Sequence, residues 1–205
     1  MSAILGTAVT HFAQRGYEGA RVDAIAEDAG VNKALLYYHF RDKASLYERV
    51  LLDVIRQTAS AVTSNIRPLD TPEEKLRTYI HTFAQNVNSN PSFAPLMLRE
   101  VASGGATLTP EVLHQIGRLL KVLRDLLKDG ELAGMLKPVS PVAVHMQIIG
   151  SVLYFIAGEP IREKMLEIGF EASETLSGVS TDGAAEYITE IVLNGLRTNP
   201  QSQHD

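Results

Sequence analysis

The chain has 205 residues, of which 45% are hydrophobic and 21% are charged, and its formal net charge is −5. This composition is that of a globular protein with a full core, and the absence of cysteine excludes disulfides and thiol chemistry. The most apolar run, residues 142–157, is interrupted by polar side chains and is shorter than a bilayer span, so it predicts a buried helix. Because a helical pattern begins by Ile4 with no basic stretch before it, we expect no signal peptide, no membrane association and a cytoplasmic location.

The charge is distributed unevenly along the chain. Residues 1–50 carry six Lys/Arg and six Asp/Glu, whereas residues 51–205 carry thirteen and eighteen. The N-terminal part is therefore neutral, and its long-range attraction to an anionic partner should be modest. This balance favours a protein that reads a nucleotide sequence over a general nucleic-acid coat.

Three helices are predicted within the first 40 residues. The first covers residues 2–15, and a short one with apolar side chains three and four apart covers residues 22–29. Gly30 then allows a left-handed turn, and Asn32 offers a side-chain oxygen to the first N–H groups of a helix at 33–40. Two short helices joined by such a turn are typical of a helix-turn-helix, whose second helix enters the DNA major groove. By itself, this pattern leaves an ordinary helical hairpin open as the alternative.

A long helix follows this module and leads out of it. Asp42 caps the helix, which covers residues 43–66 and ends before Pro68. Lys43 at its start places an ammonium beside the free N–H groups of the first turn, an arrangement that suits a phosphate. The helix is the mechanical link between the N-terminal module and the rest of the chain.

The remaining chain shows only helical patterns. A Ser/Gly-rich loop is expected at residues 169–181, and the tail from Thr198 is expected to fray. The predicted fold class is all-α, with about nine or ten helices, in an N-terminal helix-turn-helix domain at 1–48 and a C-terminal helical domain at 49–205. The predicted helices of the second domain cover 72–89, 92–102, 110–133, 141–157, 160–168 and 182–196.

The sequence lacks the motifs of common enzymatic sites. It has no phosphate-binding Gly-rich loop, no GxSxG and no HExxH. Glu111 and His114 have the Glu-x-x-His spacing of di-iron bundles, but no second His follows a Glu at that spacing. We therefore predict no enzymatic activity, no cofactor and no metal.

Residues 4–51 contain a set of residues at fixed spacing: 12–17 (FAQRGY), Ile25-Ala26, Ala29-Gly30-Val31, Lys33, 36–40 (LYYHF), Lys43 and Leu46. With these residues the segment resembles the N-terminal domain of the TetR family of tetracycline-repressor-like regulators. The resemblance implies that 1–48 is a DNA-binding domain and 49–205 a ligand-binding and dimerisation domain. It further implies a homodimeric transcriptional regulator of a palindromic DNA operator, most often a repressor released by a small ligand that shifts the helix starting at Lys43.

The expected DNA-binding region, residues 21–43, departs from the family at three positions. Arg21 stands where Thr or Ser usually caps a helix, Asp23 where a basic residue is frequent, and Leu35 where a hydroxyl residue is common. Leu35 is expected to face the groove, with packing against the preceding helix as the alternative. We assign Lys33 to a guanine, Ala34 and Leu35 to thymine methyls, and Arg21, Tyr37, His39 and Lys43 to phosphates. Asn32 and Tyr38 complete the expected DNA-binding set.

Two helices near the C-terminus, 141–157 and 182–196, carry more apolar surface than a chain of this size is expected to cover. The resemblance implies that they pair with their mates across a twofold axis as a four-helix interface. The alternative is burial inside the chain. The expected interface residues are Ile148, Val152, Phe155, Ala185, Ile188, Val192 and Leu196.

A mostly apolar cavity is expected among the helices at 72–89, 92–102, 110–133 and 141–157. Plain core packing is the alternative for any single residue of the set, and an apolar or aromatic ligand is expected because no Arg cluster marks an anion site. The expected lining is Tyr79, Phe83, Phe93, Met97, His114, His145, Met146 and Tyr154.

Two other functions remain open from the sequence. One is a DNA-binding regulator controlled by a protein partner without a small ligand. The other is an all-α ligand-carrying or enzymatic bundle whose helical hairpin is coincidental. The combination of Lys33, Tyr37, His39 and Lys43 argues against the second.

Overall fold

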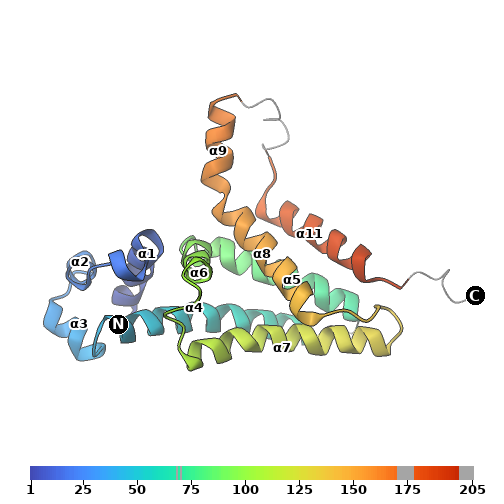
Figure 1. Ribbon diagram of the computed structural model, residues 1–205, viewed down its shortest axis with the longest axis horizontal. Coiled ribbons are helices and arrows are strands. Elements are labelled where there is room, and N and C mark those ends of the chain that lie inside the picture. The colour runs from blue at the N-terminus through green and yellow to red at the C-terminus, as the bar shows by residue number, and fades with distance from the viewer. Residues whose placement is uncertain (68, 70, 170–177, 199–205) are drawn as a thin grey trace, which may run out of the picture. The chain divides into compact units, whose positions relative to one another are not determined.

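The computed structural model describes residues 1–67, 69, 71–169 and 178–198, and this part of the chain contains ten α-helices and no strand (Figure 1). The all-α expectation is therefore confirmed, while most of the expected 169–181 loop and the tail from 199 lie outside the described residues. The helices are α1 (Ser2–Gly19), α2 (Val22–Asp28), α3 (Lys33–His39), α4 (Lys43–Ile66), α5 (Pro72–Ser89), α6 (Phe93–Ala102), α7 (Pro110–Leu132), α8 (Pro141–Ala157), α9 (Glu159–Glu167) and α11 (Thr181–Leu196).

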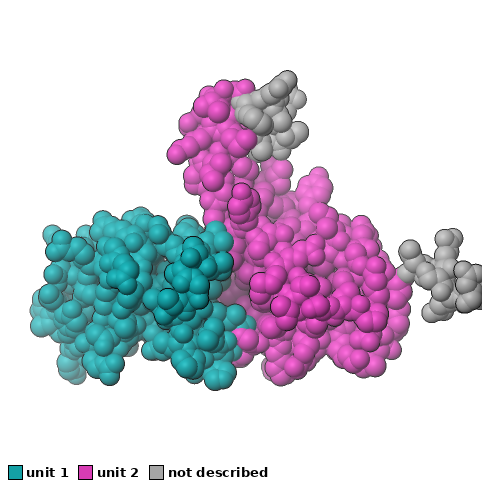
Figure 2. Space-filling model, in the orientation of Figure 1, with its two compact units in different colours: residues 1–57, 90–116 teal, residues 58–89, 117–205 magenta. Residues whose placement is uncertain are grey.

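The chain forms two compact units, which Figure 2 colours separately. Unit 1 consists of residues 1–57 and 90–116, and unit 2 of residues 58–89 and 117–205. Unit 1 thus contains the N-terminal module together with α6, which comes much later in the sequence. Helices α4 and α7 each contribute residues to both units.

The core of unit 1 is an aromatic and aliphatic cluster drawn mainly from α1 to α4 and α6. Phe12, Leu36 and Leu46 are fully buried in it. The Phe12 ring meets the Tyr47 ring edge-on, with 4.6 Å between their centroids. The centroid of the Tyr17 ring lies 5.1 Å from that of Tyr47. These contacts bury the inner sides of α2 and α3 and leave their outer sides to solvent.

Helix α6 is attached to α1 by the guanidinium of Arg99. Gly16, at φ 70°, interrupts the helical geometry of α1, so the carbonyls just before it lack their normal partners. Arg99 donates from Nε to the carbonyl of Ala13 at 2.8 Å and from Nη2 to that of Gln14 at 2.7 Å. The side chain thereby caps the regular part of α1.

A buried carboxylate joins α6 to α4. Tyr47 Oη donates to Glu100 Oε1 at 2.5 Å, and Thr107 Oγ1 donates to Glu100 Oε2 at 2.7 Å. Burial, together with the neighbouring carboxylate, raises the pKa of the Tyr47 hydroxyl, so it stays protonated and remains a donor at neutral pH. Both side chains are almost fully buried.

Unit 2 is built around the packing of α5, α8 and α11. The start of α5 has a capping box, since Glu74 N donates to Thr71 Oγ1 at 3.2 Å and Thr71 N donates to Glu74 Oε2 at 3.1 Å. Arg77 on α5 pairs with Glu186 and Glu190 on α11. By contrast, α9 has no buried residue.

We expect Tyr47→Phe to lower the free energy of unfolding by about 1–3 kcal/mol, because it leaves a buried oxygen of Glu100 without its donor. Urea unfolding followed by circular dichroism measures the change. Tyr17→Phe is the matched control, because Tyr17 lies in the same ring cluster and its hydroxyl makes no hydrogen bond within the described residues. Equal stability of the two variants would show that the Glu100 bond contributes nothing.

Candidate nucleic-acid interface

The turn between α2 and α3 has the geometry expected from the sequence. Gly30 takes the left-handed conformation at φ 66°, and the N–H of Val31 donates to the carbonyl of Ala26 at 2.9 Å. Asn32 then caps α3, its Oδ1 accepting the N–H of Leu35 at 2.7 Å. The expected turn and cap are confirmed, and the cap leaves the amide nitrogen of Asn32 as its available donor.

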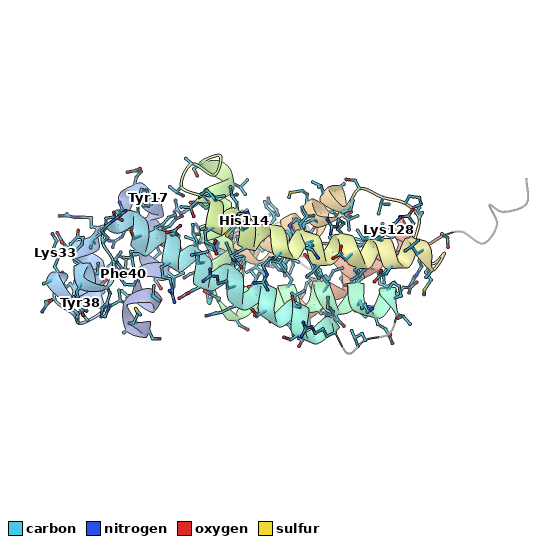
Figure 3. All side chains as sticks on the ribbon, turned by 90° about the horizontal axis from the view of Figure 1, so that it is seen from below. Tyr17, Lys33, Tyr38, Phe40, His114 and Lys128 are labelled. Atoms are coloured by element: carbon cyan, nitrogen blue, oxygen red, sulfur yellow. The ribbon has the colours of Figure 1, made fainter. Side chains whose placement is uncertain are left out.

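The outer side of α3 presents a mixed polar and apolar surface. Leu36 is fully buried, whereas Leu35 and Tyr37 are each 40% exposed and Tyr38 is 83% exposed. Lys33, Ala34 and His39 are also exposed, and Figure 3 labels Lys33 and Tyr38 on α3. The exposure of Leu35 agrees with a groove-facing role and disfavours the alternative in which it is packed away.

An ion pair that the sequence analysis did not anticipate connects the two helices. Lys33 Nζ lies 2.7 Å from Asp23 Oδ1, and the same ammonium lies 5.9 Å from the centre of the Tyr37 ring. The hydrogen bond from Lys33 lowers the pKa of the Asp23 carboxyl, and the same bond raises the pKa of the lysine. Lys33 is therefore held at the start of α3 by a carboxylate from α2.

Lys43 has a structural contact besides its expected place near a phosphate. Its ammonium donates to the carbonyl of Glu18 at 3.1 Å and lies 4.7 Å from the centre of the Tyr17 ring. The side chain thus connects the start of α4 to the end of α1, which the sequence analysis missed because these partners are about 25 residues away in sequence.

The start of α4 is capped by Asp42, as expected. Asp42 Oδ1 accepts from both the backbone N–H and the hydroxyl of Ser45 at 2.8 Å, and these bonds lower the pKa of Asp42 to about 2. Arg21 precedes α2, is exposed, and makes no side-chain cap, as its guanidinium predicts. The DNA contacts assigned to Arg21, Tyr37, His39 and Lys43 stay predictions.

The expected ligand residues fall into both units. In unit 1, Phe93 is buried, Met97 is half-buried and His114 is exposed. In unit 2, Tyr79, Phe83 and His145 are buried, whereas Met146 and Tyr154 are 59% and 74% exposed. An enclosed cavity therefore cannot draw its lining from His114, Met146 or Tyr154 in this structure. The exposed positions lie on helices whose apolar residues extend beyond one face, so helical spacing did not distinguish core from surface there.

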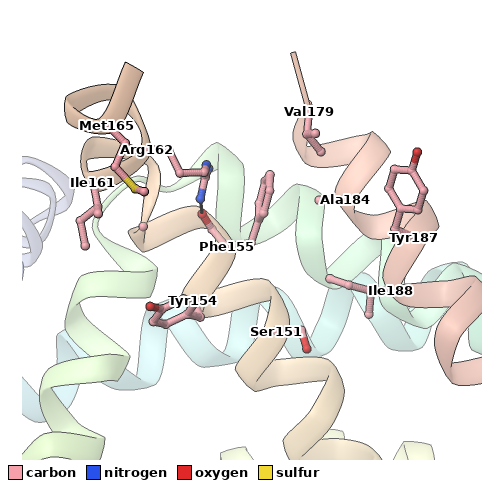
Figure 4. Close-up of a pocket in the computed structure, with 11 residues that line it drawn as sticks. Ser151, Tyr154, Phe155, Ile161, Arg162, Met165, Val179, Ala184, Tyr187 and Ile188 are labelled. Atoms are coloured by element: carbon pink, nitrogen blue, oxygen red, sulfur yellow. Dashed lines mark hydrogen bonds between the residues drawn. The ribbon is translucent and has the colours of Figure 1, made fainter. Parts of the chain in front are cut away.

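A groove in unit 2 lies elsewhere, between α8, α9 and α11 (Figure 4). Its volume is about 470 Å³, and Tyr154 is the one expected ligand residue among those that line it. Arg162 Nη1 donates to the carbonyl of Phe155 at 2.5 Å, and its guanidinium lies 4.1 Å from the centre of the Phe155 ring. The other walls include Ile161, Tyr187 and Ile188.

Most of the expected dimer residues are buried within the chain. A side chain that is already buried inside the chain has no surface left for a partner, and five of the seven are 5% exposed or less. Helix α11 packs its most regular apolar stripe against α5 and α8, so the intramolecular alternative accounts for that stripe. The remaining two, Phe155 and Ile188, are half-buried and line the groove. The five buried residues are Ile148, Val152, Ala185, Val192 and Leu196.

A different face of the same two helices is apolar and exposed. On α8 it carries Val142, Met146 and Tyr154, and on α11 it carries Tyr187 and Ile191, each between 53% and 74% exposed. The sequence analysis missed this face because α8 is apolar almost all round, so its periodicity does not distinguish the inner side from the outer.

Within the described residues, no group of three or more His, Cys, Asp or Glu side chains could hold a metal ion. No single helix there is long and apolar enough to cross a membrane; only α8 and α9 taken together reach that length and composition, and they are bent by 46° at Gly158.

A helix-turn-helix with an exposed second helix, in an all-helical chain, defines the class of DNA-binding transcriptional regulators. Residues 4–50 match the bacterial regulatory proteins of the tetR family, and residues 72–182 match the tetracyclin repressor-like C-terminal domain. The chain therefore belongs to the TetR family and is a DNA-binding transcriptional regulator.

Several known proteins are similar to this chain. The HTH-type transcriptional regulator RutR of Escherichia coli K12 is 27% identical over 198 residues, covering 95% of this chain and 89% of RutR. The biofilm operon icaADBC negative regulator IcaR of Staphylococcus aureus Newman is 46% identical over 46 residues, which is 22% of this chain and 25% of IcaR. The solved structure of FadR from Bacillus subtilis in complex with stearoyl-CoA has a TM-score of 0.76 at 18% identity, covering 95% and 98% of the two chains, and so shares the fold.

We expect Leu35→Ser to weaken binding about fivefold, roughly 1 kcal/mol, at one or two T·A pairs, because an exposed apolar side chain contacts the thymine methyl. The operator is first obtained by selecting random duplexes with the wild-type protein. Replacing by uracil only the one or two thymines at which the variant loses affinity removes their methyls alone; it should reproduce the loss in the wild type and add nothing to the variant.

Leu132→Ser, at an exposed apolar position on α7, serves as the control and should bind like the wild type. If uracil substitution leaves the affinity of the wild-type protein unchanged, Leu35 does not read the sequence.

Proposed function

We propose that this regulator is a homodimeric repressor that binds a palindromic operator and leaves it when a small apolar molecule binds in unit 2. The observation that carries the proposal is the exposed apolar face of α8 and α11. Large exposed apolar patches mark interaction surfaces, and a twofold axis would pair this face with itself.

Small residues within the face support a close approach of helices. Along α8, Gly150 lies between Met146 and Tyr154 at four-residue spacing, and along α11, Gly195 follows Ile191 at the same spacing. An added Cβ at either glycine would meet nothing within 4 Å in this chain, so both positions are open to a partner. Two helices of one chain and two of its mate would form a four-helix contact.

The comparisons support a negative regulator with an apolar effector. IcaR is named as a negative transcriptional regulator, and FadR was solved with stearoyl-CoA, which carries a long acyl chain. The family consists of transcriptional regulators, and we accordingly propose no catalytic activity for this chain.

The interior of unit 2 offers a polar pair in apolar surroundings where such an effector could bind. Tyr79 Oη lies 3.4 Å from His145 Nδ1 and 3.4 Å from the carbonyl of Leu119, so both hydrogen bonds are long. Burial raises the pKa of Tyr79 and lowers the pKa of His145, so both groups are uncharged at neutral pH. A ligand with a long apolar part and one uncharged polar group would match this pair.

Ligand binding can affect DNA binding only if the two states of the protein bind the ligand with different affinity. Helix α4 is one of the covalent connections between the units, because it begins at Lys43 in unit 1 and continues to Ile66 in unit 2. In this proposal, the effector favours a position of α4 in which the spacing of the two α3 helices of the dimer no longer matches the spacing of the operator half-sites.

Tyr187→Glu combined with Ile191→Glu should give a monomer that no longer binds the operator. Burying these charges across a symmetric interface costs on the order of several kcal/mol. Sedimentation measures the assembly state, and a gel shift on the selected duplex measures DNA binding. Both side chains are exposed in the single chain, so the variant is expected to fold.

Leu132→Glu is the matched control, since Leu132 is 75% exposed and lies on α7, which carries no residue of the proposed face. It should remain a dimer. An intact dimer in the double variant would rule out this face as the interface.

Dodecan-1-ol, which has an apolar chain and one hydroxyl, should raise the thermal unfolding midpoint of the wild-type protein and release the selected duplex. Tyr79→Phe and His145→Leu should reduce both effects, whereas Leu132→Ala, at an exposed position on α7, should not. If dodecan-1-ol, indole and naphthalene all leave the midpoint and the DNA complex unchanged, the effector proposal fails and control by a protein partner is favoured.

A further inference from the structure

The ion pair between Asp23 and Lys33 places a carboxylate beside the start of α3, the helix expected to enter the DNA major groove. Asp23 lies in the first turn of α2, and Lys33 is the first residue of α3. The two charged atoms are 2.7 Å apart, and each side chain is 56% exposed. An exposed pair of this kind contributes little to folding stability.

A carboxylate beside DNA has a cost, because it repels the phosphates that supply most of the general affinity. Residues 1–50 have no excess of basic residues to offset that repulsion, since they carry equal numbers of acidic and basic side chains. Any favourable contribution of Asp23 to DNA recognition should therefore come from its effect on the position and hydrogen bonding of Lys33.

The ion pair limits the hydrogen bonds that Lys33 can make. An ammonium has three N–H donors, and Asp23 Oδ1 takes one of them. Guanine offers two acceptors in the major groove, O6 and N7, which matches the two donors that remain. A lysine on a flexible chain otherwise pairs with any phosphate as a point charge, and the ring of Tyr37 at 5.9 Å further restricts its position.

We propose that Asp23 is a specificity-determining residue, which positions Lys33 for guanine and opposes its pairing with phosphate. This rests on the proposed function, operator binding, and on the assignment of Lys33 to a guanine of that operator. Asp23 acts through Lys33 and is a positioning residue.

The proposal predicts opposite effects of one substitution on two kinds of DNA. Asp23→Asn should strengthen binding to a scrambled duplex of the same length about threefold and steepen its salt dependence by about 1 in log–log slope, because Lys33 becomes free to contact a phosphate. The ratio of operator affinity to scrambled affinity should fall about tenfold. Binding is measured by fluorescence anisotropy from 50 to 300 mM KCl, with duplexes selected by the wild-type protein.

Glu27→Gln is the matched control, because Glu27 lies exposed on the same helix and forms no ion pair within the described residues. It removes the same charge and should leave the affinity ratio unchanged. In a Lys33→Met background, Asp23→Asn should no longer alter the ratio.

Two outcomes would overturn the inference: an unchanged ratio in Asp23→Asn, or an equal fall in the ratio with Lys33 absent. If the wild-type protein enriches no sequence from the random library, the proposed operator reading itself fails. Enrichment by the wild type with an unaltered ratio in Asp23→Asn would remove the role of Asp23 alone.

Discussion

The carboxylate of Glu100 is almost fully buried, and both of its oxygens must therefore be satisfied by donors inside the protein. Tyr47 from α4 and Thr107 from the loop after α6 supply those donors. The neighbouring Arg99 reaches the carbonyls that the break at Gly16 leaves free on α1. Two adjacent residues of opposite charge thus fix α6 to the first and fourth helices, and the orientation of α2 and α3 depends on this frame.

Features that depend on neighbouring residues could be predicted from the sequence. The bounds of α4 and α5, the left-handed turn at Gly30 and the caps at Asn32 and Asp42 all follow from residues within one helical turn. The exposure of Leu35 also followed, because Leu36 and Phe40 already occupy the inner side of α3. Local hydrogen bonding and steric limits decide these features with little influence from the rest of the chain.

Features that depend on distant partners could not be predicted. The pair of Asp23 with Lys33 and the contact of Lys43 with Glu18 require two elements to meet at a particular angle, which no spacing encodes. The interface residues expected on α11 mostly lie on its buried side, because its buried and exposed sides both carry large apolar residues, such as Val192 and Ile191. Apolar periodicity identifies a helix that packs, but not which of two partners covers each face.

The interleaved order of the two units has a consequence for synthesis on the ribosome. Domains usually fold as units while the chain emerges, N-terminal parts first. Here the first 57 residues emerge without α6, so Tyr47 has no carboxylate to bond and the free carbonyls of α1 have no cap. Residues 58–89, which belong to unit 2, follow before the missing segment at 90–116 appears. Unit 1 is therefore complete only after more than half of the chain has been made, and no single continuous segment that omits unit 2 contains all of it.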